Sequence, residues 1–467
     1  MERLRGMLLQ GLLVIGLMLA MLPLRPSSGL AGGFRIADQG AAAAGQANAF
    51  TAQADDASAI HYNPAGITQL RGLQLYGGAN LVGGSTNFTT STGVTTHGNF
   101  GNSIASPAPF NLYMTANLAD VGLPALRGWS VGIGVTTPFG LVYHYPTNGP
   151  FATAVTQEQL PMIDIKPTVA YKLNDQLSFG LGADIYTFSG LLSGAHAFDQ
   201  KLISSGGPGL PPAGIPLELN GSDTAAGFNV SMLYTPLRSA DGKPLVNVGL
   251  VYRSQVALHL TGDFLANGSL VTHSSSTLVL PQMLTGGIAI WPVRNPTHEW
   301  KLELDIDYTD WKSVRNTDVH LANGTTIPFA QNWRGTYTAM VGTEYKWLQI
   351  PALPNWEVAL RAGYWHSQTP VPDAAFNPAV PDADQHMIAV GLGTLCKVGG
   401  RFLSMIPCGQ GSRWLPSAIG LDVAYQALFY ESRTVAGNAN PIAIPGSVNG
   451  TYQTTFHVGS VNLRLNF

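Results

Sequence analysis

Residues that could do chemistry are widely spaced in this chain of 467 residues. A hydrolytic site would need a Ser, a His and an Asn or acid within reach of one another. The histidines follow no nucleophile motif and are scattered along the chain, at His61, His144, His259, His298, His366, His386 and His457. No Cys/His cluster has metal spacing, and a formal charge of −3 gives no basic surface for nucleic acid. We therefore expect no enzyme, no metal or cofactor, and no nucleic-acid partner.

Three cations are better placed to bind a ligand. Lys166, Arg253 and Arg361 lie at positions that an alternating pattern turns to one common side of their segments. A ligand that carries a carboxylate needs a cation, whereas an uncharged apolar guest needs none. The alternative for each cation is a structural ion pair with one of the acids expected on the same side, which are Glu303, Asp305, Asp307 and Glu344.

The segments that carry these charges have the pattern of β-strands. In residues 300–308, aliphatic residues share one face and charged residues share the other, with Trp300 and Tyr308 at the two ends. Period two over this length indicates a strand, and aromatic rings suit the two water interfaces of a membrane. At about 3.3 Å per residue and a tilt of about 40°, such a strand spans about 20 Å, close to the apolar band of an outer membrane.

Repetition of this pattern predicts the fold class, an all-β transmembrane antiparallel β-barrel of about 14 strands. An even number closes the sheet without an edge in lipid, and no apolar run long enough for a membrane helix follows Leu24. Short connections at 174–175, 239–243 and 292–297 alternate with long ones at 194–220, 313–332, 368–384 and 433–450, as periplasmic turns and outer loops do. The segments are 73–88, 107–119, 127–144, 160–173, 177–193, 221–236, 245–264, 277–293, 298–312, 333–347, 355–367, 385–396, 417–432 and 451–467.

The two ends of the chain indicate where it works. Residues 1–30 are expected to be a secretory signal peptide, with Arg3 and Arg5 before the apolar run 7–24; a single membrane anchor is the alternative. The last strand ends in Phe467, which resembles the signal read by the barrel assembly machinery. We expect a monomer in the bacterial outer membrane, in contact with its lipid and lipopolysaccharide.

Two cysteines fall in a connection that breaks the alternation of lengths. Cys396 and Cys408 could form one disulfide in an oxidising compartment, or could remain two unpaired thiols in a turn. The connection around residues 396–414 lies on the side of the short turns but is long. The sequence assigns it no function.

An Ala/Gly-rich, strandless stretch precedes the barrel and predicts a plug at residues 31–71, in front of a barrel at 72–467. Asn63 can cap a turn and Pro64 fixes φ, so these residues and Ala65 are expected to form a rigid turn in the plug. An ordinary surface turn is the alternative for this motif. Asp55 and Asp56 are expected to pair with inward Lys or Arg and hold the plug in place.

The third predicted strand contains a break. Pro138 donates no ladder hydrogen bond and Gly140 supports a bend, so pairing should fail locally around Phe139. Unsatisfied backbone groups facing lipid cost several kcal/mol each, so the break should persist only where a cavity or protein covers it. Either it is a lateral opening for an apolar molecule, or Pro138 marks the outer end of the strand.

Together these residues resemble the FadL/TodX family of outer-membrane transporters for long-chain fatty acids and other hydrophobic compounds. The resemblance covers essentially the whole mature chain. It rests on Gly32-Gly33-Phe34, Ala54-Asp55-Asp56-Ala57-Ser58, Asn63-Pro64-Ala65, Thr137-Pro138-Phe139-Gly140, Tyr252-Arg253-Ser254, Leu280-Pro281, residues 307–311, residues 361–364 and residues 378–382, in that order.

The resemblance implies a fourteen-stranded barrel blocked by an N-terminal hatch, with capture at outer loops and a tighter site in the lumen. It also implies release sideways through a kink in the third strand. The expected function is passive uptake of long-chain fatty acids or similar compounds, with Lys166, Arg253 and Arg361 as candidate lumen ligands. A channel of the same fold for monoaromatic or alkane hydrocarbons, and a general diffusion porin, are the alternatives.

Overall fold

The computed structural model describes residues 32–101, 103–188, 198–207, 210–409 and 415–467. The expected signal peptide at residues 1–30 lies outside the described residues. Within the described part of the chain, no helix is both long enough and apolar enough to cross a membrane.

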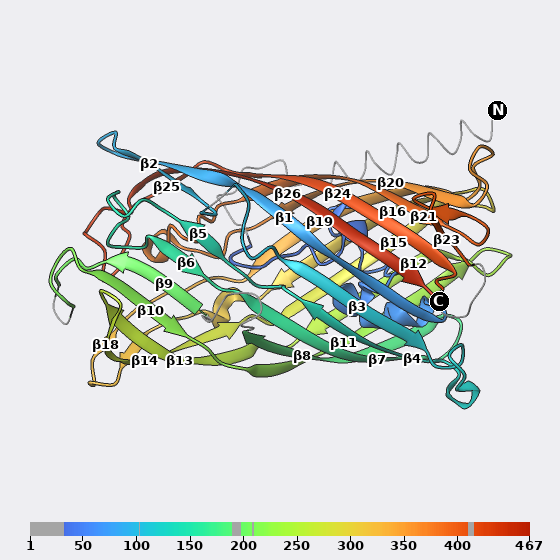
Figure 1. The fold of residues 1–467 in the computed structure, drawn as a ribbon, viewed down its shortest axis with the longest axis horizontal. Coiled ribbons are helices and arrows are strands. Elements are labelled where there is room, and N and C mark those ends of the chain that lie inside the picture. The colour runs from blue at the N-terminus through green and yellow to red at the C-terminus, as the bar shows by residue number, and fades with distance from the viewer. Residues whose placement is uncertain (1–31, 102, 189–197, 208–209, 410–414) are drawn as a thin grey trace.

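Fourteen antiparallel strands close into one barrel, as the alternating pattern predicts (Figure 1). The first strand pairs with the last from Gln74 opposite Asn466 to Thr90 opposite Gly450, so neither is left as an edge. The wall strands are β1 (Leu73–Thr90), β3 (Phe110–Asn117), β4 (Trp129–Thr136), β7 (Met162–Lys172), β8 (Leu177–Phe188), β11 (Ala225–Arg238), β12 (Pro244–Arg253), β15 (Met283–Arg294), β16 (His298–Thr309), β19 (Thr336–Trp347), β20 (Trp356–Ser367), β21 (Gln385–Cys396), β24 (Ala418–Tyr430) and β26 (Gly450–Asn466).

Beyond one rim the wall continues into the long connections, at the left-hand end of Figure 1. Several of these strands pair with one another in series, from β5 through β6, β9, β10 and β13 to β14. The strands of this extension are β2 (Thr95–Asn99), β5 (Val142–His144), β6 (Gln157–Gln159), β9 (Phe198–Ile203), β10 (Pro216–Gly221), β13 (Val256–Ala266), β14 (Ser269–Leu280), β17 (Val319–Leu321), β18 (Thr326–Ile327) and β25 (Arg433–Val435). Two 3-10 turns, η3 (Trp311–Ser313) and η4 (Asp373–Ala375), lie in the same connections.

Two predicted strands are each divided in the structure. The segment 245–264 separates into β12 and β13 at Ser254 and Gln255, and the segment 277–293 separates into β14 and β15 at Pro281 and Gln282. Proline interrupts a ladder because it has no N–H. Beyond these divisions β13 pairs with β10 and β14, and β14 pairs with β13 and β17, instead of with the barrel wall, so alternation continues although the partner strands change.

The two faces of the wall have opposite chemistry. Leu360, Ile388, Val390 and Leu463 point outward and are exposed, as a lipid-facing surface requires. The alternate positions carry buried polar and charged side chains inside the barrel, including Lys166, Asp184, Arg253, Glu303, Asp305, Asp307, Glu344, Arg361 and Asp422. The inward placement expected for Lys166, Arg253, Glu303, Asp305, Asp307, Glu344 and Arg361 is therefore confirmed.

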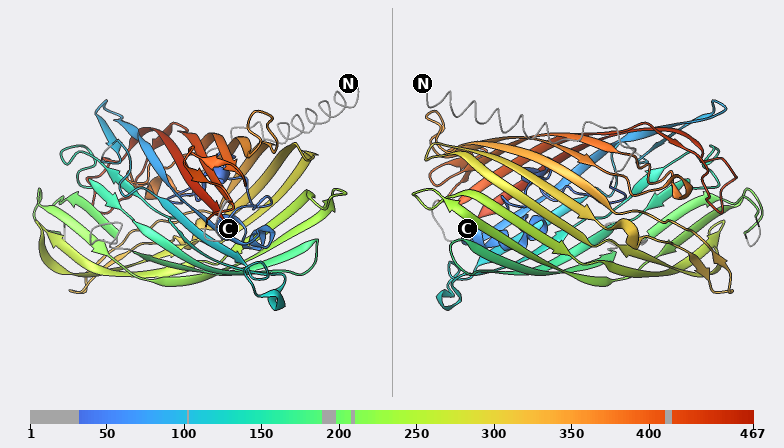
Figure 2. Two further views of the ribbon diagram at one scale, coloured as in Figure 1. Left: turned by 45° about the vertical axis from the view of Figure 1, so that its right-hand side comes forward. Right: turned by 180° about the vertical axis from the view of Figure 1, so that it is seen from behind.

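Residues 32–71, here called the plug segment, lie inside the barrel near the end that holds the short turns and the C-terminus (Figures 1 and 2). Its elements are α2 (Ala41–Ala44), α3 (Ala59–Tyr62) and η1 (Pro64–Gln69). Small side chains let the segment approach the wall closely: a Cβ on Gly363 of β20 would stand 2.4 Å from the carbonyl carbon of Gln46. Residues 32–39 are called the front end, and residues 41–69 the plug body.

Candidate functional site

The plug body is fastened to β16 by two buried carboxylates. The backbone N–H groups of Phe50 and Thr51 donate to Asp305 Oδ2 at 2.9 and 2.8 Å. Those of Ala52 and Gln53 donate to Glu303 Oε1 at 2.6 and 3.2 Å. Glu303 and Asp305 are two positions apart on one strand, so both side chains point into the lumen and meet one plug turn. Four successive plug amides thus bond to ionisable acceptors.

Asn63 joins the plug body to itself and to the wall. Its amide nitrogen donates to Thr51 O at 2.8 Å and to Met232 O of β11 at 3.1 Å. Its side-chain oxygen accepts from Ala65 N at 3.2 Å, while Pro64 occupies the first turn of η1. The turn role expected of these three residues is confirmed, and the bond to Met232 adds a contact with the wall.

Asp55 and Asp56 pair with inward cations, as expected. Asp55 Oδ2 lies 3.2 Å from Lys346 Nζ, and Asp56 Oδ2 lies 3.4 Å from Arg464 Nη2. Asp56 also accepts from Ser58 N at 2.8 Å. The middle of the plug body, residues 50–56, is therefore held by the carboxylates of β16 and, directly after them, by ion pairs with Lys346 and Arg464.

The predicted wall break is present between β4, which ends at Thr136, and β5, which begins at Val142. The front end covers its backbone groups. Ile36 N donates to Pro138 O at 2.8 Å, and Gly140 N donates to Phe34 O at 3.1 Å. Residues 137–141 are here called the wall break. Its Pro138 carbonyl and Gly140 amide are thus satisfied by protein, which is the condition that lipid imposes.

Gln39 completes this cover with its side-chain amide. Its Nε2 donates to Thr137 O at 3.1 Å, and its Oε1 accepts from Thr137 N at 3.2 Å. The amide reproduces the pair of bonds that a neighbouring strand would make. Gln39 could not be predicted from the sequence, because it is 98 positions from its partner and belongs to no periodic pattern.

An inner cavity of about 240 Å³ lies between the front end, the plug body and the wall break. Its lining includes Phe139 and Gly140 of the break, as well as Thr51 and His61 of the plug body. Most of the remaining lining residues are apolar. The cavity therefore reaches the wall break, where Pro138, Phe139 and Gly140 are predicted to form a lateral opening.

An outer cavity of about 610 Å³ lies among the long connections. Apolar side chains from separate connections line it, among them Phe198, Leu260, Val319, Phe329 and Phe376. Phe34, Leu141, Leu160 and Val380 line both cavities and so stand between them.

Phe34 is the aromatic centre of that boundary. Its ring centroid lies 5.1 Å from that of Trp311, 5.9 Å from that of Trp333 and 5.8 Å from that of Phe139. Gly33 has φ of 63°, and a Cβ there would stand 2.9 Å from the Trp311 ring, so glycine lets the front end turn beneath the aromatic group. Phe34 belongs to the motif Gly32-Gly33-Phe34, but no pattern in the sequence predicts that it lies in a site.

The charged groups near the cavities are largely matched. Arg35 and Arg253 line the inner cavity, and their ion-pair partners are Asp307 at 2.7 Å and Asp184 at 3.1 Å. Lys166 pairs with Asp164 and Asp184, while Arg361 pairs with Glu344 and Asp422 at 2.7 Å each. Of the three candidate cations, Arg253 faces a cavity, whereas Lys166 and Arg361 line neither cavity.

Two acids in the long connections have pKa values close to neutral pH. Burial raises the pKa of Glu158 to about 7, although a hydrogen bond from Asn377 lowers it. Burial likewise raises the pKa of Asp382 to about 7, against the hydrogen bond from Thr369. Glu158 lines the outer cavity, and Asp382 lines the inner cavity and accepts from Gly33 N at 3.3 Å.

Comparison with known proteins gives a consistent family. The sequence model described as "Outer membrane protein transport protein (OMPP1/FadL/TodX)" matches residues 24–396. A relative from Escherichia coli O6:H1, named long-chain fatty acid transport protein, is 26% identical over 374 residues, covering 73% of this chain and 78% of its own length.

Solved structures share the fold. A Pseudomonas aeruginosa FadL homologue superposes with a TM-score of 0.69 at 16% identity, over 93% of this chain and 100% of that one. The toluene transporter TodX of Pseudomonas putida gives a TM-score of 0.58 at 15% identity, over 88% and 94% of the two chains.

Proposed function

The chain belongs to the FadL/TodX family of outer membrane transport proteins, and from that premise we propose that it is a passive channel for uptake of long-chain fatty acids or similar hydrophobic compounds. The observation that carries the proposal is the order of its apolar spaces. The outer cavity borders the inner cavity at Phe34, and the inner cavity reaches the wall break at Phe139 and Gly140.

In this proposal a substrate is captured in the outer cavity, passes Phe34 into the inner cavity, and leaves sideways into the membrane through the wall break. Each buried CH₂ of an apolar chain is worth about 0.8 kcal/mol relative to water. A route that passes from one apolar space to the next avoids repaying that energy. No energy source is needed if the substrate is removed from the membrane afterwards.

The plug segment acts as the hatch in this scheme. It blocks the axial path, and the contacts of Asp55, Asp56 and Asn63 support a fixed position for the plug body. We also propose that the chain works as a monomer among outer-membrane lipid and lipopolysaccharide. The closed pairing of β1 with β26 supports a barrel complete within one chain, and Phe467 supports insertion by the barrel assembly machinery.

Arg35 and Arg253 are the cations that support a fatty acid. Both line the inner cavity, and both contacts from Arg35 to Asp307 and Thr309 use its Nη1 alone. A carboxylate could then approach another edge of the Arg35 guanidinium. Arg253 remains a candidate from the sequence, although its Nε already donates to Asp184.

An uncharged hydrocarbon is the second candidate, because the cations are already paired. Arg35 and Arg253 have carboxylate partners within 3.1 Å. Among its described lining residues, the outer cavity has Glu158 but no Lys or Arg. An anionic substrate would therefore meet an acid before it met a cation.

Direct binding distinguishes the two candidates. A labelled long-chain fatty acid and labelled toluene would be titrated into purified wild-type protein and into Arg35→Gln, with Arg315→Gln in an outer connection as the control. Fatty-acid transport predicts tighter binding of the fatty acid and a loss confined to Arg35→Gln. Tighter binding of toluene, unchanged in both variants, would assign the hydrocarbon instead. Equal weak binding of both would leave the fatty acid unsupported.

A further inference from the structure

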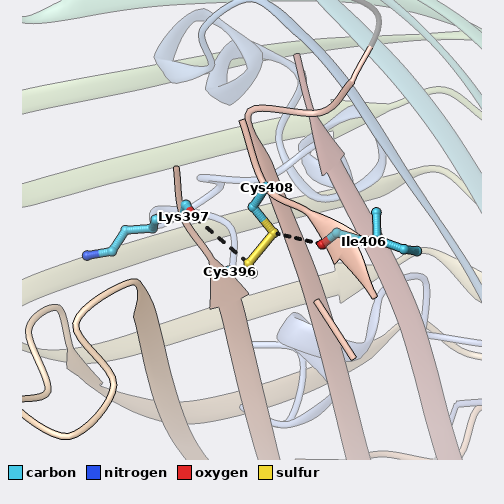
Figure 3. Close-up of a disulfide and its surroundings, with 4 residues drawn as sticks. All are labelled: Cys396, Lys397, Ile406 and Cys408. Atoms are coloured by element: carbon cyan, nitrogen blue, oxygen red, sulfur yellow. Dashed lines mark hydrogen bonds between the residues drawn. A yellow bond between two sulfur atoms is a disulfide. The ribbon is translucent and has the colours of Figure 1, made fainter. Parts of the chain in front are cut away.

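The connection between β21 and β24 carries a small hairpin. It contains a two-stranded sheet of its own, β22 (Arg401–Phe402) and β23 (Ile406–Pro407). A disulfide between Cys396 and Cys408 joins its far arm to the end of β21 (Figure 3). Residues 397–409 are here called the rim hairpin. The structure therefore decides between the two states that the sequence left open for these cysteines.

The rim hairpin lies against the lipid-facing side of the wall. Phe402 packs with Cys396, Cys408 and Ile419, and its ring centroid lies 6.2 Å from that of Trp356 in a stacked arrangement. Cys396 shares its side of β21 with exposed Ile388, Val390 and Leu392, because every second residue of a strand points the same way. By the same alternation, Trp356, Ile419, Leu421 and Leu465 share their sides with exposed Leu360, Tyr425 and Leu463.

The opposite face of the rim hairpin is apolar and exposed. Leu403 is 66% exposed and Met405 is 72% exposed, and Val398 and Ile406 are also exposed. The turn at residues 239–243, between β11 and β12 on the same rim, is polar, with the sequence Ser-Ala-Asp-Gly-Lys. Water alone does not favour this group of large apolar side chains at a turn.

The tip of the hairpin adds a second unusual feature. Leu403 has φ of 49° and Ser404 has φ of 63°, so both occupy the left-handed region that bulky side chains seldom adopt. A leucine held there with its side chain directed away from the protein gains little from contacts within the chain. Its apolar surface requires a partner outside the chain.

Charge on the hairpin matches a bilayer surface. Arg401 is exposed on β22, and within the described residues no carboxylate contacts it. Lys397 is held instead by Leu348 O at 2.7 Å and by Glu357 at 3.4 Å. A cation beside apolar side chains, with Trp356 nearby, is the usual composition at the boundary between lipid headgroups and acyl chains.

We propose that the rim hairpin is a membrane anchor that inserts into the phospholipid leaflet on the short-turn side of the barrel. Leu403, Met405 and Ile406 enter the boundary of the acyl chains, and Arg401 contacts headgroup phosphate. The apolar face is continuous with the lipid-facing wall below it. The disulfide holds the hairpin against that wall and fixes how deep this rim sits in the membrane.

Photolabelling from lipid tests the anchor without any mutation. The full-length protein would be placed in nanodiscs of phosphatidylethanolamine and phosphatidylglycerol that contain a phospholipid with a diazirine in its acyl chain. After irradiation, reduction and tryptic digestion, the peptide beginning at Phe402 should carry lipid adducts at least about fivefold above those in the turn at 239–243. Adducts no higher than in that turn would overturn the proposal. A protein partner would then be the alternative occupant of the apolar face.

Two variants then distinguish the role of the apolar side chains from the role of the disulfide. Aspartate tolerates the left-handed backbone conformation at the tip of the hairpin. Leu403→Asp combined with Met405→Asp should therefore preserve the turn and remove the lipid adducts from the hairpin. Heat-modifiability should show that the barrel remains folded. Cys396→Ser combined with Cys408→Ser should reduce them by releasing the hairpin from the wall. Ala240→Asp in the polar turn is the matched control and should change neither. Adducts that persist in the double Asp variant would contradict insertion of these side chains.

Discussion

The two parts of the plug segment are held in different ways. The plug body bonds to Asp305 and Glu303 and forms ion pairs through Asp55 and Asp56. The front end has one ion pair, between Arg35 and Asp307, whereas its contacts with the wall break are neutral bonds of Phe34, Ile36 and Gln39 and the aromatic contact of Phe34 with Phe139.

Charge-assisted hydrogen bonds contribute about 1.5 to 3 kcal/mol each, against about 0.5 to 1.5 kcal/mol for neutral ones. This difference in bond strength indicates that the two parts of the plug segment have different roles in the proposed transport. In the proposed transport scheme, the plug body keeps the axial path closed, whereas the contacts of Phe34, Ile36 and Gln39 with the wall break are the part that an entering apolar molecule displaces. Displacing Phe34 and a few neutral bonds costs an amount that burial of several CH₂ groups, at about 0.8 kcal/mol each, can offset.

The largest effect is expected from unfastening the plug body. Glu303→Ala combined with Asp305→Ala removes the acceptors of four plug amides and leaves Lys301 buried without Glu303. We expect the plug body to leave its position and the barrel to conduct small hydrophilic solutes, because the lost bonds are worth about 1.5 to 3 kcal/mol each. Liposome swelling with small sugars measures this directly.

Glu299→Gln is the control for that experiment. It lies on the same strand and contacts Lys243 and Arg294 instead of the plug. It should leave swelling at the wild-type level. A sealed barrel in the double variant would mean that the plug body is not fastened by β16.

The next effect is expected at Asn63. Asn63→Ala removes its bonds to Thr51 and Met232, at a cost of about 1 to 3 kcal/mol for buried groups left without partners. Uptake of a hydrophobic substrate by cells should fall, while heat-modifiability shows a folded barrel. Asn323→Ala in an outer connection should take up substrate normally. Unchanged uptake in Asn63→Ala would count against the hatch.

A smaller and local effect is expected at Gln39. Gln39→Leu removes both amide bonds to Thr137, which should weaken the cover of the wall break by about 1 to 2 kcal/mol. Amide exchange in residues 137–141 should rise about 5- to 30-fold. Gln69→Leu breaks bonds to Gln53 O and Ala54 O within the plug body, and should leave exchange at the break unchanged. Equal changes in both variants would show that the two parts of the plug are not independent.

The smallest effect is expected from pH. Burial raises the pKa of Asp382 to about 7, above its usual value of 3.8, so ionisation is less favourable in the folded protein than in the unfolded one. The contribution of protonated Asp382 to the stability of the folded protein is fully present below a pH of about 4 and is lost as the pH rises through about 7. Amide protection in the connection that contains Asp382, residues 368–384, corrected for intrinsic exchange, should therefore decrease over that range.

Asp382→Asn should flatten most of that dependence. Some should remain, because burial also raises the pKa of Asp384 to about 7. A decrease of the same size in the variant would place the titrating group elsewhere.

The barrel could be predicted because its information is local. Alternation in residues 300–308 and similar segments determines which face is apolar, and Pro138 with Gly140 marks a place where the ladder must fail. The division at Pro281 was missed, because β13 and β14 keep the alternating pattern after leaving the wall.

Contacts of the plug required the structure because they join distant residues. Gln39 and Thr137 are 98 positions apart, and Phe50 and Asp305 are 255 positions apart. Neither pair of residues is marked by a periodic pattern or a characteristic spacing in the sequence. Inward charges could be recognised at Lys166, Arg253 and Arg361, but their ion-pair partners depend on the register between strands, which alternation does not specify.

Under the proposed function, a hydrophobic substrate leaves through the wall break instead of along the barrel axis. A long-chain fatty acid with a diazirine at its apolar end would be photolysed with the protein in lipid nanodiscs, and its adducts mapped by peptide. Lateral exit predicts adducts at residues 137–141 and on Phe34, with none on the underside of the plug body near Asp56 and Arg464. Adducts around Asp56 and Arg464, with none at the wall break, would contradict it.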